Sequence, residues 1–572
     1  MAAASVCAHG PGTWHWSRTL PLAVVLAIAL GVGAGIAGVL LPAFGWWPAL
    51  GRSVLSLDVW RELLAWPGLS RAVALTLWTG LVATAASVAL SLLIVAALHR
   101  TRAYRLLAGA LAPLLAIPHA AAAFGLAFLI APSGWIARVL SPGLTGWEVP
   151  PDLLVVSDPV GLSLVAGLIL KEVPFLLLMI MAALSRAEFG RSAVVAQGFG
   201  HGRIAAWMLV VLPRIYPMLR LPVLAVLAYS LGAVEMAMIL GPTRPAPLAV
   251  MIVDWAAQPD LGLRFRAAAG AVLLLCVTLA ALLIWTLLER GISLAGRHAA
   301  VQGWRFRSLD PPLLAAGRLT AGLVTLGLLI AVVGLGLWSV AGLWRFPDLV
   351  PDQLTLRAWT SQAPALSRAL SATLALAALS VFPCLIVVIL LLEAESRSGA
   401  GSWGMRILWL PLLVPQVAFL PGVQVLALGA GQDVGLGIVA AAHALFVLPY
   451  VWIVLAGPWR SWDSRAGLVA RSLGAGPWRV LWAVRLPMLL RPLAAAAAVG
   501  VAVSVAQYLP TLLLGGGRIA TLTTEAVALS SGGNRRVIGV WAFAQALVPL
   551  AGFALALLVP AFLLRNRRGL AA

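Results

Sequence analysis

The stretch "SLGAGPWRVLWAVRLP", from Ser472 to Pro487, interrupts a chain that is otherwise rich in apolar residues. A related stretch, "GFGHGRIAAWMLVVLP", runs from Gly198 to Pro213. Aligned on their Leu-Pro, both fit the pattern A-x3-G-x9-V-x-L-P. The shared positions are Ala196, Gly200, Val210, Leu212 and Pro213 in the first copy and Ala470, Gly474, Val484, Leu486 and Pro487 in the second. The repetition indicates a duplicated structural element.

The glycine and the proline of the pattern predict its shape. A glycine adopts positive φ without steric cost, so it can end one short helix and turn the chain. The nine residues after it are enough for a second helix. Leu-Pro then ends that helix or opens the next one, because proline lacks an N–H. We therefore expect a helix–turn–helix on the membrane surface in each copy.

The rest of the chain has the composition of a membrane protein. It has 572 residues, of which 62% are hydrophobic and 10% charged, and its mean hydropathy is +1.01. Apolar runs of about 20 residues, long enough to span a bilayer, recur along it, whereas a β-barrel would alternate apolar and polar residues. We predict an all-α polytopic protein with about twelve transmembrane helices. The expected spans are Leu20–Leu41, Ala72–Leu98, Leu106–Ile130, Gly161–Leu184, Leu221–Leu240, Ala267–Leu288, Pro312–Val340, Ala369–Leu392, Ile407–Leu428, Gly437–Leu455, Pro492–Leu514 and Val537–Leu564.

The basic charge follows these spans. The net charge is +20. With the N-terminus in the cytoplasm, the inner segments hold 24 arginines and 6 acidic residues, and the outer segments hold 13 arginines and 11 acidic residues. Positive residues accumulate on the cytoplasmic side of membrane proteins. The charge therefore indicates topology, with both termini in the cytoplasm, rather than a nucleic-acid partner.

The chain also repeats itself. "LSRAVALTL" at Leu69–Leu77 returns as "LSRALSATL" at Leu366–Leu374, 297 residues later, and Pro118 matches Pro415 at the same offset. We expect two homologous six-helix halves, residues 1–300 and 301–572, with the duplicated segments at about 185–220 and 457–491 on the inner side. Parallel repeats that enclose a pathway at their interface are typical of transporters.

The duplicated pattern resembles the EAA loop of ABC-importer permeases, E-A-A-x3-G-x9-I-x-L-P. Arg471 fits the basic residue that often follows the alanines, while Val194 and Leu468 replace the glutamate. By this resemblance the chain is identified as a type I permease of the fused two-half kind, similar to those for ferric iron and thiamine. The stretch 507–539 is most similar to the YnjC-like branch, which is associated with thiamine-type importers.

The resemblance implies a permease subunit in the bacterial inner membrane. It implies two cytoplasmic ATPase subunits docked on the loops and a periplasmic binding protein that delivers a small solute, thiamine-like or ferric-iron-like. A Walker A loop needs a lysine that reaches the phosphates, and the one lysine, Lys171, follows Leu-Ile-Leu inside a span. We therefore expect a chain that is not an enzyme and holds no cofactor, with ATP and Mg bound to the partner. The alternative is an ion- or proton-coupled secondary transporter.

Ionisable residues inside spans are costly and often functional. Glu235 lies in the fifth span, and Lys171 and Glu172 are adjacent in the fourth. Gln507 and Tyr508 lie near the place equivalent to Glu235 in the second half. These five residues either line the substrate pathway or pair with neighbouring helices. His119 and His443 lack the spacing of a metal site, as do the three cysteines, so no metal is expected.

Overall fold

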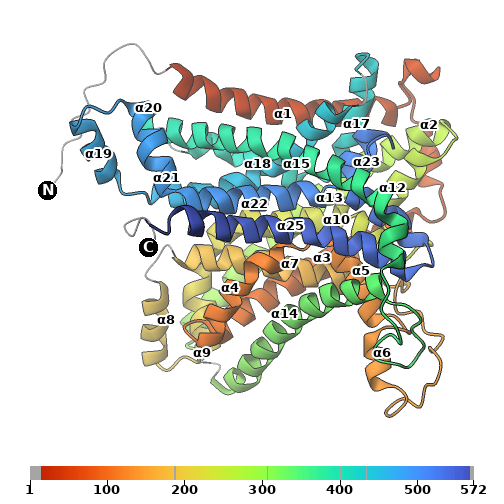
Figure 1. Cartoon of the computed structure of the whole chain (residues 1–572), viewed down its shortest axis with the longest axis horizontal. Helices are drawn as coiled ribbons and strands as arrows, with labels where there is room; N and C mark the ends of the chain where they lie inside the picture. The colour runs from red at the N-terminus through yellow and green to blue at the C-terminus, as the bar shows by residue number, and fades with distance from the viewer. Residues whose placement is uncertain (1–14, 186–188, 306, 399–401, 433–434, 567–572) are drawn as a thin grey trace.

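The computed structural model describes residues 15–185, 189–305, 307–398, 402–432 and 435–566, and within these ranges the regular elements are helices (Figure 1). Ten helices in the described residues are long and apolar enough to cross a membrane. Two bent helix pairs raise the number to twelve if each pair counts as one span. The all-α polytopic class predicted from the sequence is confirmed.

The long unbroken helices lie side by side along the long axis of the molecule (Figure 1). They are α1 (His15–Ala43), α3 (Leu69–Leu98), α7 (Leu162–Ser185), α13 (Gly262–Val301), α14 (Asp310–Val340), α15 (Arg357–Ser398), α18 (Leu436–Arg460) and α25 (Arg535–Leu563). Several contain internal prolines, for example Pro174 in α7 and Pro383 in α15. Membrane helices tolerate such residues because neighbouring helices satisfy the freed backbone groups.

Four expected spans are broken, which the sequence did not predict. The broken spans are α4 (Arg102–Ala116) with α5 (His119–Ile130), α10 (Leu212–Gly232) with α11 (Glu235–Leu240), α16 (Leu410–Leu413) with α17 (Gln416–Gly429), and α22 (Leu490–Ala506) with α23 (Leu509–Gly515). Pro118 and Pro415 cause two of the breaks, because proline disfavours helical geometry in the residue before it. The preceding residues are extended, with ψ of 120° at Ile117 and 124° at Val414.

The first helix of each expected half packs on the other half. Helix α1 packs on α17, and α14 packs on α5. Gly35 and Gly422 meet so closely that a Cβ on Gly422 would lie 1.8 Å from the Gly35 carbonyl oxygen. Gly125, 297 residues before Gly422, makes the equivalent contact with Ala331 of α14. Helices α1 and α14 thus lie at opposite edges of the bundle (Figure 1).

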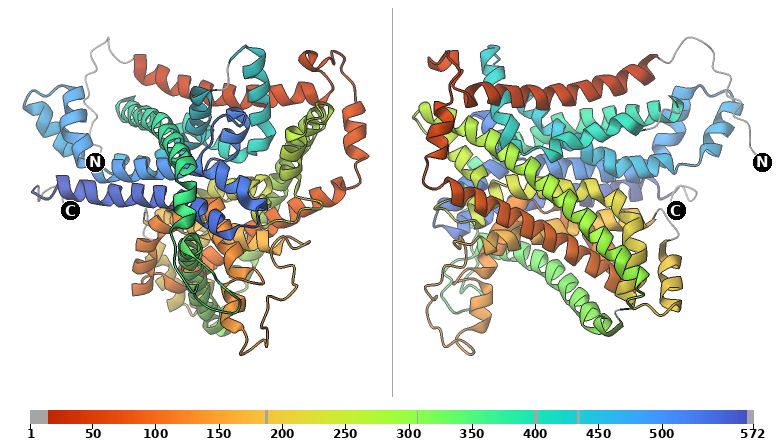
Figure 2. Two further views of the ribbon diagram at one scale, coloured as in Figure 1. Left: turned by 45° about the vertical axis from the view of Figure 1, so that its right-hand side comes forward. Right: turned by 180° about the vertical axis from the view of Figure 1, so that it is seen from behind.

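The short helices lie at the two ends of the bundle. Helices α8 (Phe189–Gly198), α9 (Arg203–Ala206), α19 (Ser464–Ser472) and α20 (Pro477–Val480) lie at one end, where α1 begins and α25 ends (Figure 1). Helices α2 (Asp58–Leu64), α6 (Trp135–Leu140) and α12 (Leu248–Ala257) lie at the opposite end, and the view from behind shows the same separation (Figure 2). The division into halves at residue 300 stays a prediction, and α13 continues to Val301 through most of the polar segment between them.

Candidate functional site: a central polar cavity and two matched loops

The helix breaks meet at the centre of the molecule, around a cavity of about 210 Å³. Residues flanking all four breaks line it: Ile117, Pro118, Gly232, Glu235, Val414, Pro415, Gln507 and Tyr508. Gly232 packs directly on Pro415, since a Cβ added to Gly232 would lie 3.1 Å from the Pro415 Cβ. The cavity therefore lies where the first and second expected halves meet.

Lys171 of α7 binds the end of α4. Its Nζ donates to the carbonyl oxygen of Ile117 at 2.6 Å and lies 3.5 Å from that of Leu114. The last carbonyl groups of a helix have no helical N–H partner and carry partial negative charge. The lysine is buried, so its ammonium group is stabilised by the carbonyl groups that the α4–α5 break exposes.

Glu172, the next residue of α7, faces α5 instead. Its Oε1 lies 3.6 Å from Nε2 of His119, the first residue of α5. Neighbours on a helix point about 100° apart, which explains why Lys171 and Glu172 contact different helices. Both side chains nevertheless line the same cavity.

Glu235 follows the break between α10 and α11. It is buried, and its Oε1 accepts a hydrogen bond of 2.9 Å from the hydroxyl of Tyr229. The Tyr229 ring lies 4.7 Å from the imidazole ring of His119, centroid to centroid. Two buried carboxylates, Glu172 and Glu235, therefore face one cavity together with a histidine and a tyrosine.

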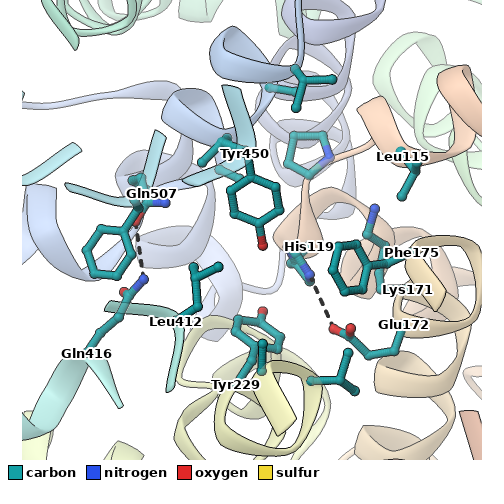
Figure 3. Close-up of a pocket in the computed structure, with 18 of the residues that line it drawn as sticks. Leu115, His119, Lys171, Glu172, Phe175, Tyr229, Leu412, Gln416, Tyr450 and Gln507 are labelled. Atoms are coloured by element: carbon teal, nitrogen blue, oxygen red, sulfur yellow. Dashed lines mark hydrogen bonds and ion pairs between the residues drawn. The ribbon is translucent and has the colours of Figure 1, made fainter. Parts of the chain in front are cut away.

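The opposite wall is uncharged. Nε2 of Gln416 donates to Oε1 of Gln507 at 3.3 Å. Figure 3 shows this amide pair on one side of the cavity and the His119–Glu172 pair on the other, with Tyr229 and Tyr450 between them. The charged lining residues thus come from the first expected half and the paired amides from the second.

The structure brings the expected pathway residues together. Lys171, Glu172, Glu235, Gln507 and Tyr508 all line the cavity. The sequence interpretation missed the further lining residues His119, Phe175, Tyr229, Gln416 and Tyr450. A signal for some of them was available. His119 and Gln416 follow the matched prolines Pro118 and Pro415, and Phe175 and Tyr450 occupy matched positions after Pro174 and Pro449.

His443 does not line the cavity. Its Nδ1 lies 2.9 Å from the hydroxyl of Ser504, and its Nε2 lies 2.9 Å from that of Thr511. It is a buried histidine with both ring nitrogens hydrogen-bonded. Such an environment indicates a structural residue that holds α18 to α22 and α23.

The two duplicated segments, called loop 1 (residues 189–213) and loop 2 (residues 464–487) below, share one backbone turn. The glycines have positive φ, +92° at Gly200 and +86° at Gly474. In loop 1 the Gly200 amide donates to the Gln197 carbonyl and the His201 amide to that of Ala196. In loop 2 the Gly474 amide donates to the Arg471 carbonyl, and the Ala475 amide donates to that of Ala470. Both turns are Schellman motifs.

This motif explains the A-x3-G spacing. The carbonyl of the pattern alanine, Ala196 or Ala470, accepts the hydrogen bond from the amide five residues later. The glycine four residues after the alanine is the residue with left-handed backbone conformation just beyond the helix end. The spacing is thus set by the closing geometry of α8 and α19.

The V-x-L-P end of the pattern forms a second shared feature. Val210 and Val484 lie in π-helical turns, η2 (Trp207–Val211) and η5 (Leu481–Arg485). The amides of Leu212 and Leu486 donate to carbonyl groups five residues back. Pro213 and Pro487 then lie in the first turn of α10 and of α21 (Leu486–Met488). The Leu-Pro pairs open the following helices, where a missing N–H costs nothing.

Loop 1 is held by the first residue of α14 and by the segment before that helix. The carboxylate of Asp310 accepts hydrogen bonds from the amides of Arg203 and Ile204, at 2.5 and 3.0 Å, at the start of α9. The Gly202 amide donates to the Arg305 carbonyl at 2.8 Å. A Cβ on Gly202 would lie 2.8 Å from Oδ2 of Asp310. Loop 1 is therefore capped by a residue more than 100 positions away.

Loop 2 is held by a buried ionic cluster. Arg485 donates to Oε2 of Glu393 at 2.8 Å, and Arg397 donates to Oε1 of the same carboxylate at 2.6 Å. The Arg485 guanidinium also lies over Trp459 and Trp462, 4.2 and 4.7 Å from their ring centroids. These contacts join the end of α15 to η5, the π-helical turn of loop 2.

Helix α19 of loop 2 also has its own N-cap. The carboxylate of Asp463 accepts a hydrogen bond of 3.0 Å from the Arg465 amide. That bond lowers the pKa of the Asp463 carboxyl, because it stabilises the ionised form. Asp463 is therefore a charged N-cap at neutral pH. Its negative charge also interacts favourably with the positive N-terminal end of the α19 dipole.

Both loops carry solvent-exposed apolar side chains. Val195 and Phe199 of loop 1 are exposed, as are the matched residues Val469 and Leu473 of loop 2. Phe199 is 75% exposed and Leu473 is 82% exposed. The residues at the glutamate position of the pattern, Val194 and Leu468, are exposed on the same helices. Each loop thus carries a cluster of three apolar residues, called its apolar face below: Val194, Val195 and Phe199 in loop 1, and Leu468, Val469 and Leu473 in loop 2.

The chain is similar to three curated bacterial proteins. It is 33% identical over 520 residues to the inner membrane ABC transporter permease protein YnjC of Escherichia coli, which covers 90% of this chain and 93% of the relative. It is 27% identical over 495 residues to the thiamine transport system permease protein ThiP of Salmonella typhimurium, covering 81% and 83% of the two chains. The ThiP of Escherichia coli is 26% identical over 535 residues, 88% of each chain. No family model matches.

Proposed function

Since the chain belongs to the ABC transporter permeases of the inner membrane, we propose that it receives a small solute from a periplasmic binding protein. We further propose that two cytoplasmic ATPase subunits dock on loop 1 and loop 2 and drive the transport. It is an importer permease. The observation that carries the proposal is the same Schellman turn and π-helical turn occurring twice at one end of the molecule. A partner with two equivalent binding grooves would engage two such matched loops.

We place this end in the cytoplasm. The segments at this end carry most of the excess arginine of the chain, as the positive-inside rule requires of cytoplasmic segments. Helix α1 begins and α25 ends there as well (Figure 1). Both termini are accordingly proposed to be cytoplasmic, and the binding protein is proposed to engage the opposite end, near α2 and α6.

The contact with the ATPase is proposed to be apolar where the EAA pattern has a glutamate. The apolar faces of loop 1 and loop 2 supply that contact, because exposed apolar clusters mark interaction sites. In place of an ionic contact between the pattern glutamate and the ATPase, we propose that Phe199 and Leu473 are buried at the two docking sites.

ATP and Mg are proposed to bind to the ATPase subunits. Binding would draw the two subunits together and, through the loops, move the helices that follow them, α10 and α22. Both helices end at breaks that line the cavity. Movement at the loops would therefore open or close the cavity toward one side of the membrane, and hydrolysis would reset it. The family membership decides against the ion- or proton-coupled carrier considered from the sequence.

The solute is proposed to be thiamine-like. Two of the relatives are named thiamine transport system permeases. The aromatic and carboxylate lining of the cavity suits such a solute better than a ferric ion, which favours a shell of anionic oxygen ligands.

The experiment uses the purified full chain and its cognate ATPase. Phe199→Glu combined with Leu473→Glu is expected to weaken their association at least tenfold, because it buries unpaired charge at both docking sites. Leu144→Glu is the matched control, since Leu144 is 83% exposed at the opposite end of the molecule. Unchanged association and unchanged ATP-dependent uptake in the double variant would overturn the docking proposal.

A further inference from the structure

We infer that the central cavity is a binding site for a compact organic cation, held between the carboxylates of Glu172 and Glu235 and the surrounding aromatic rings. This inference rests on the proposed function, because it names the solute class that passes through the cavity. Binding proteins select solutes outside the membrane, so a site here would add a second selection step within the permease.

Charge is the first argument. Among the residues that line the cavity, two are acidic and one is a lysine, and the imidazole of His119 lies 3.6 Å from the Glu172 carboxylate. The ammonium group of Lys171 is bound to the carbonyl oxygen of Ile117. In the described part of the chain, no side chain donates to Oε2 of either Glu172 or Glu235, while Oε1 of each is engaged. With His119 neutral, two buried carboxylates and one ammonium group leave one negative charge, which a monovalent cation would balance.

The aromatic rings are the second argument. Phe175, Tyr229, Tyr450 and Tyr508 line the cavity, and the hydroxyl groups of Tyr229 and Tyr450 point into it (Figure 3). Tyrosine hydroxyl oxygens can accept hydrogen bonds from a ligand, and aromatic side chains attract organic cations. A bare metal ion gains little from such walls and favours a full set of oxygen ligands. The walls therefore favour an organic cation.

The third argument is size and polarity. A cavity of about 210 Å³ is smaller than the sites of drug-sized ligands, which measure about 300–1,000 Å³. Across from the carboxylates, Gln416 and Gln507 use one hydrogen bond between themselves, which leaves amide donors and acceptors for a ligand. The occupant is thus a compact molecule with a cationic end and a neutral hydrogen-bonding end.

The test measures equilibrium binding of radiolabelled thiamine and choline to the purified permease–ATPase complex in lipid nanodiscs. The expected result is saturable binding of at least one of these cations. Glu235→Gln and Glu172→Gln should each weaken it at least tenfold. Lys171→Met should strengthen it, because it removes the one ammonium group from the cavity. A purely structural role of these residues does not predict opposite effects of the two kinds of substitution.

Glu289→Gln is the matched control. Glu289 also accepts a hydrogen bond from a tyrosine, Tyr216, but lies outside the cavity lining, so its substitution should leave cation binding unchanged. If Lys171→Met fails to fold, Gln416→Leu replaces it, with an expected loss of binding of the cation that the wild type binds. No saturable cation binding, or equal binding by the wild type and both glutamate variants, would overturn the inference. Intact ATPase association in those samples would show that the proposed function still holds.

Discussion

Loop 1 and loop 2 share one backbone conformation at their turns but are held in place by different contacts. Their glycine turns and π-helical turns match residue for residue. Loop 1 is capped by Asp310 of α14, whereas loop 2 is held by the Glu393–Arg485–Arg397 cluster. At the position 297 residues before Glu393 stands Ala96, whose carbonyl accepts a hydrogen bond from Arg203. The duplicated pattern therefore preserves the shape of the loop and not the contacts that hold it.

This difference indicates which part of each loop is shared with a partner. Features kept in both copies are the turn and the apolar faces. The features that differ are the internal contacts that hold each loop in place, called tethers below: Asp310 for loop 1 and the Glu393–Arg485–Arg397 cluster for loop 2. A substitution in a tether should thus have no counterpart in the other loop, whereas matched substitutions in the two turns should have equal effects.

The largest expected effect is on loop 2. Glu393→Ala leaves Arg485 buried without its carboxylate partner, and breaking a buried ion pair from one side costs about 3–5 kcal/mol. The thermal unfolding midpoint should fall. The increase in ATP hydrolysis that the permease causes in its ATPase, called ATPase stimulation below, should be lost. Glu395→Ala is the control, since its partner Arg460 is 40% exposed. Such a pair contributes about 1 kcal/mol or less. Equal shifts for the two variants would contradict a special role of the Glu393 cluster.

The next effect is on loop 1. Asp310→Ala removes the acceptor for two amides at the start of α9 and should cost about 2 kcal/mol, the upper range for an N-cap. Asp310→Asn keeps only one of the two acceptor oxygens, because its NH2 group faces the second amide, and should recover only part of this loss. Hydrogen exchange is expected to increase in residues 200–206 and to stay unchanged in loop 2. An increase in both loops would show that the tethers are not separate.

The glycine turns should respond equally. Gly200→Ala and Gly474→Ala each place a Cβ in the left-handed region, at a cost of about 1 kcal/mol. The two variants should lower ATPase stimulation to a similar extent. Gly51→Ala is the matched control, because Gly51 has φ of +79° and open space around it at the opposite end of the molecule. It should cost the same stability without loss of stimulation.

The smallest effect separates two matched glycines. Gly202→Ala places a Cβ 2.8 Å from the Asp310 carboxylate, whereas a Cβ on Gly476 meets nothing within 4 Å. Both residues have negative φ. Gly202→Ala should therefore disturb the cap of α9, while Gly476→Ala should change stability by less than about 0.5 kcal/mol. The two thermal unfolding midpoints measure this, and equal values would contradict the difference in tethers.

The sequence predicted what local pattern determines. Apolar length predicted the spans, and the A-x3-G pattern predicted the glycine turns, because both depend on residues close together in the chain. None of the four breaks was predicted. Near Ala233 no proline marks the break, and near Gln507 the proline, Pro510, lies in the first turn of the helix that follows, so packing between helices decides where these residues become extended.

The contacts between distant residues could not be predicted either. Asp310 reaches Arg203 across 107 residues, and Arg485 reaches Glu393 across 92. Lys171 and Glu172 were recognised as costly membrane residues, but their meeting with Tyr229 and Gln416 in one cavity depends on how the halves pack. The matched prolines Pro118 and Pro415 were the best available pointer to that cavity.

Both loops are proposed to bind an ATPase. Amide hydrogen exchange of the full chain in nanodiscs, with and without the cognate ATPase, tests this proposal. We expect slower exchange in residues 189–206 and in residues 464–480 when the ATPase is present, and no change in residues 131–160 at the opposite end. Unchanged exchange in both loops, in a sample where the ATPase is bound, would contradict it.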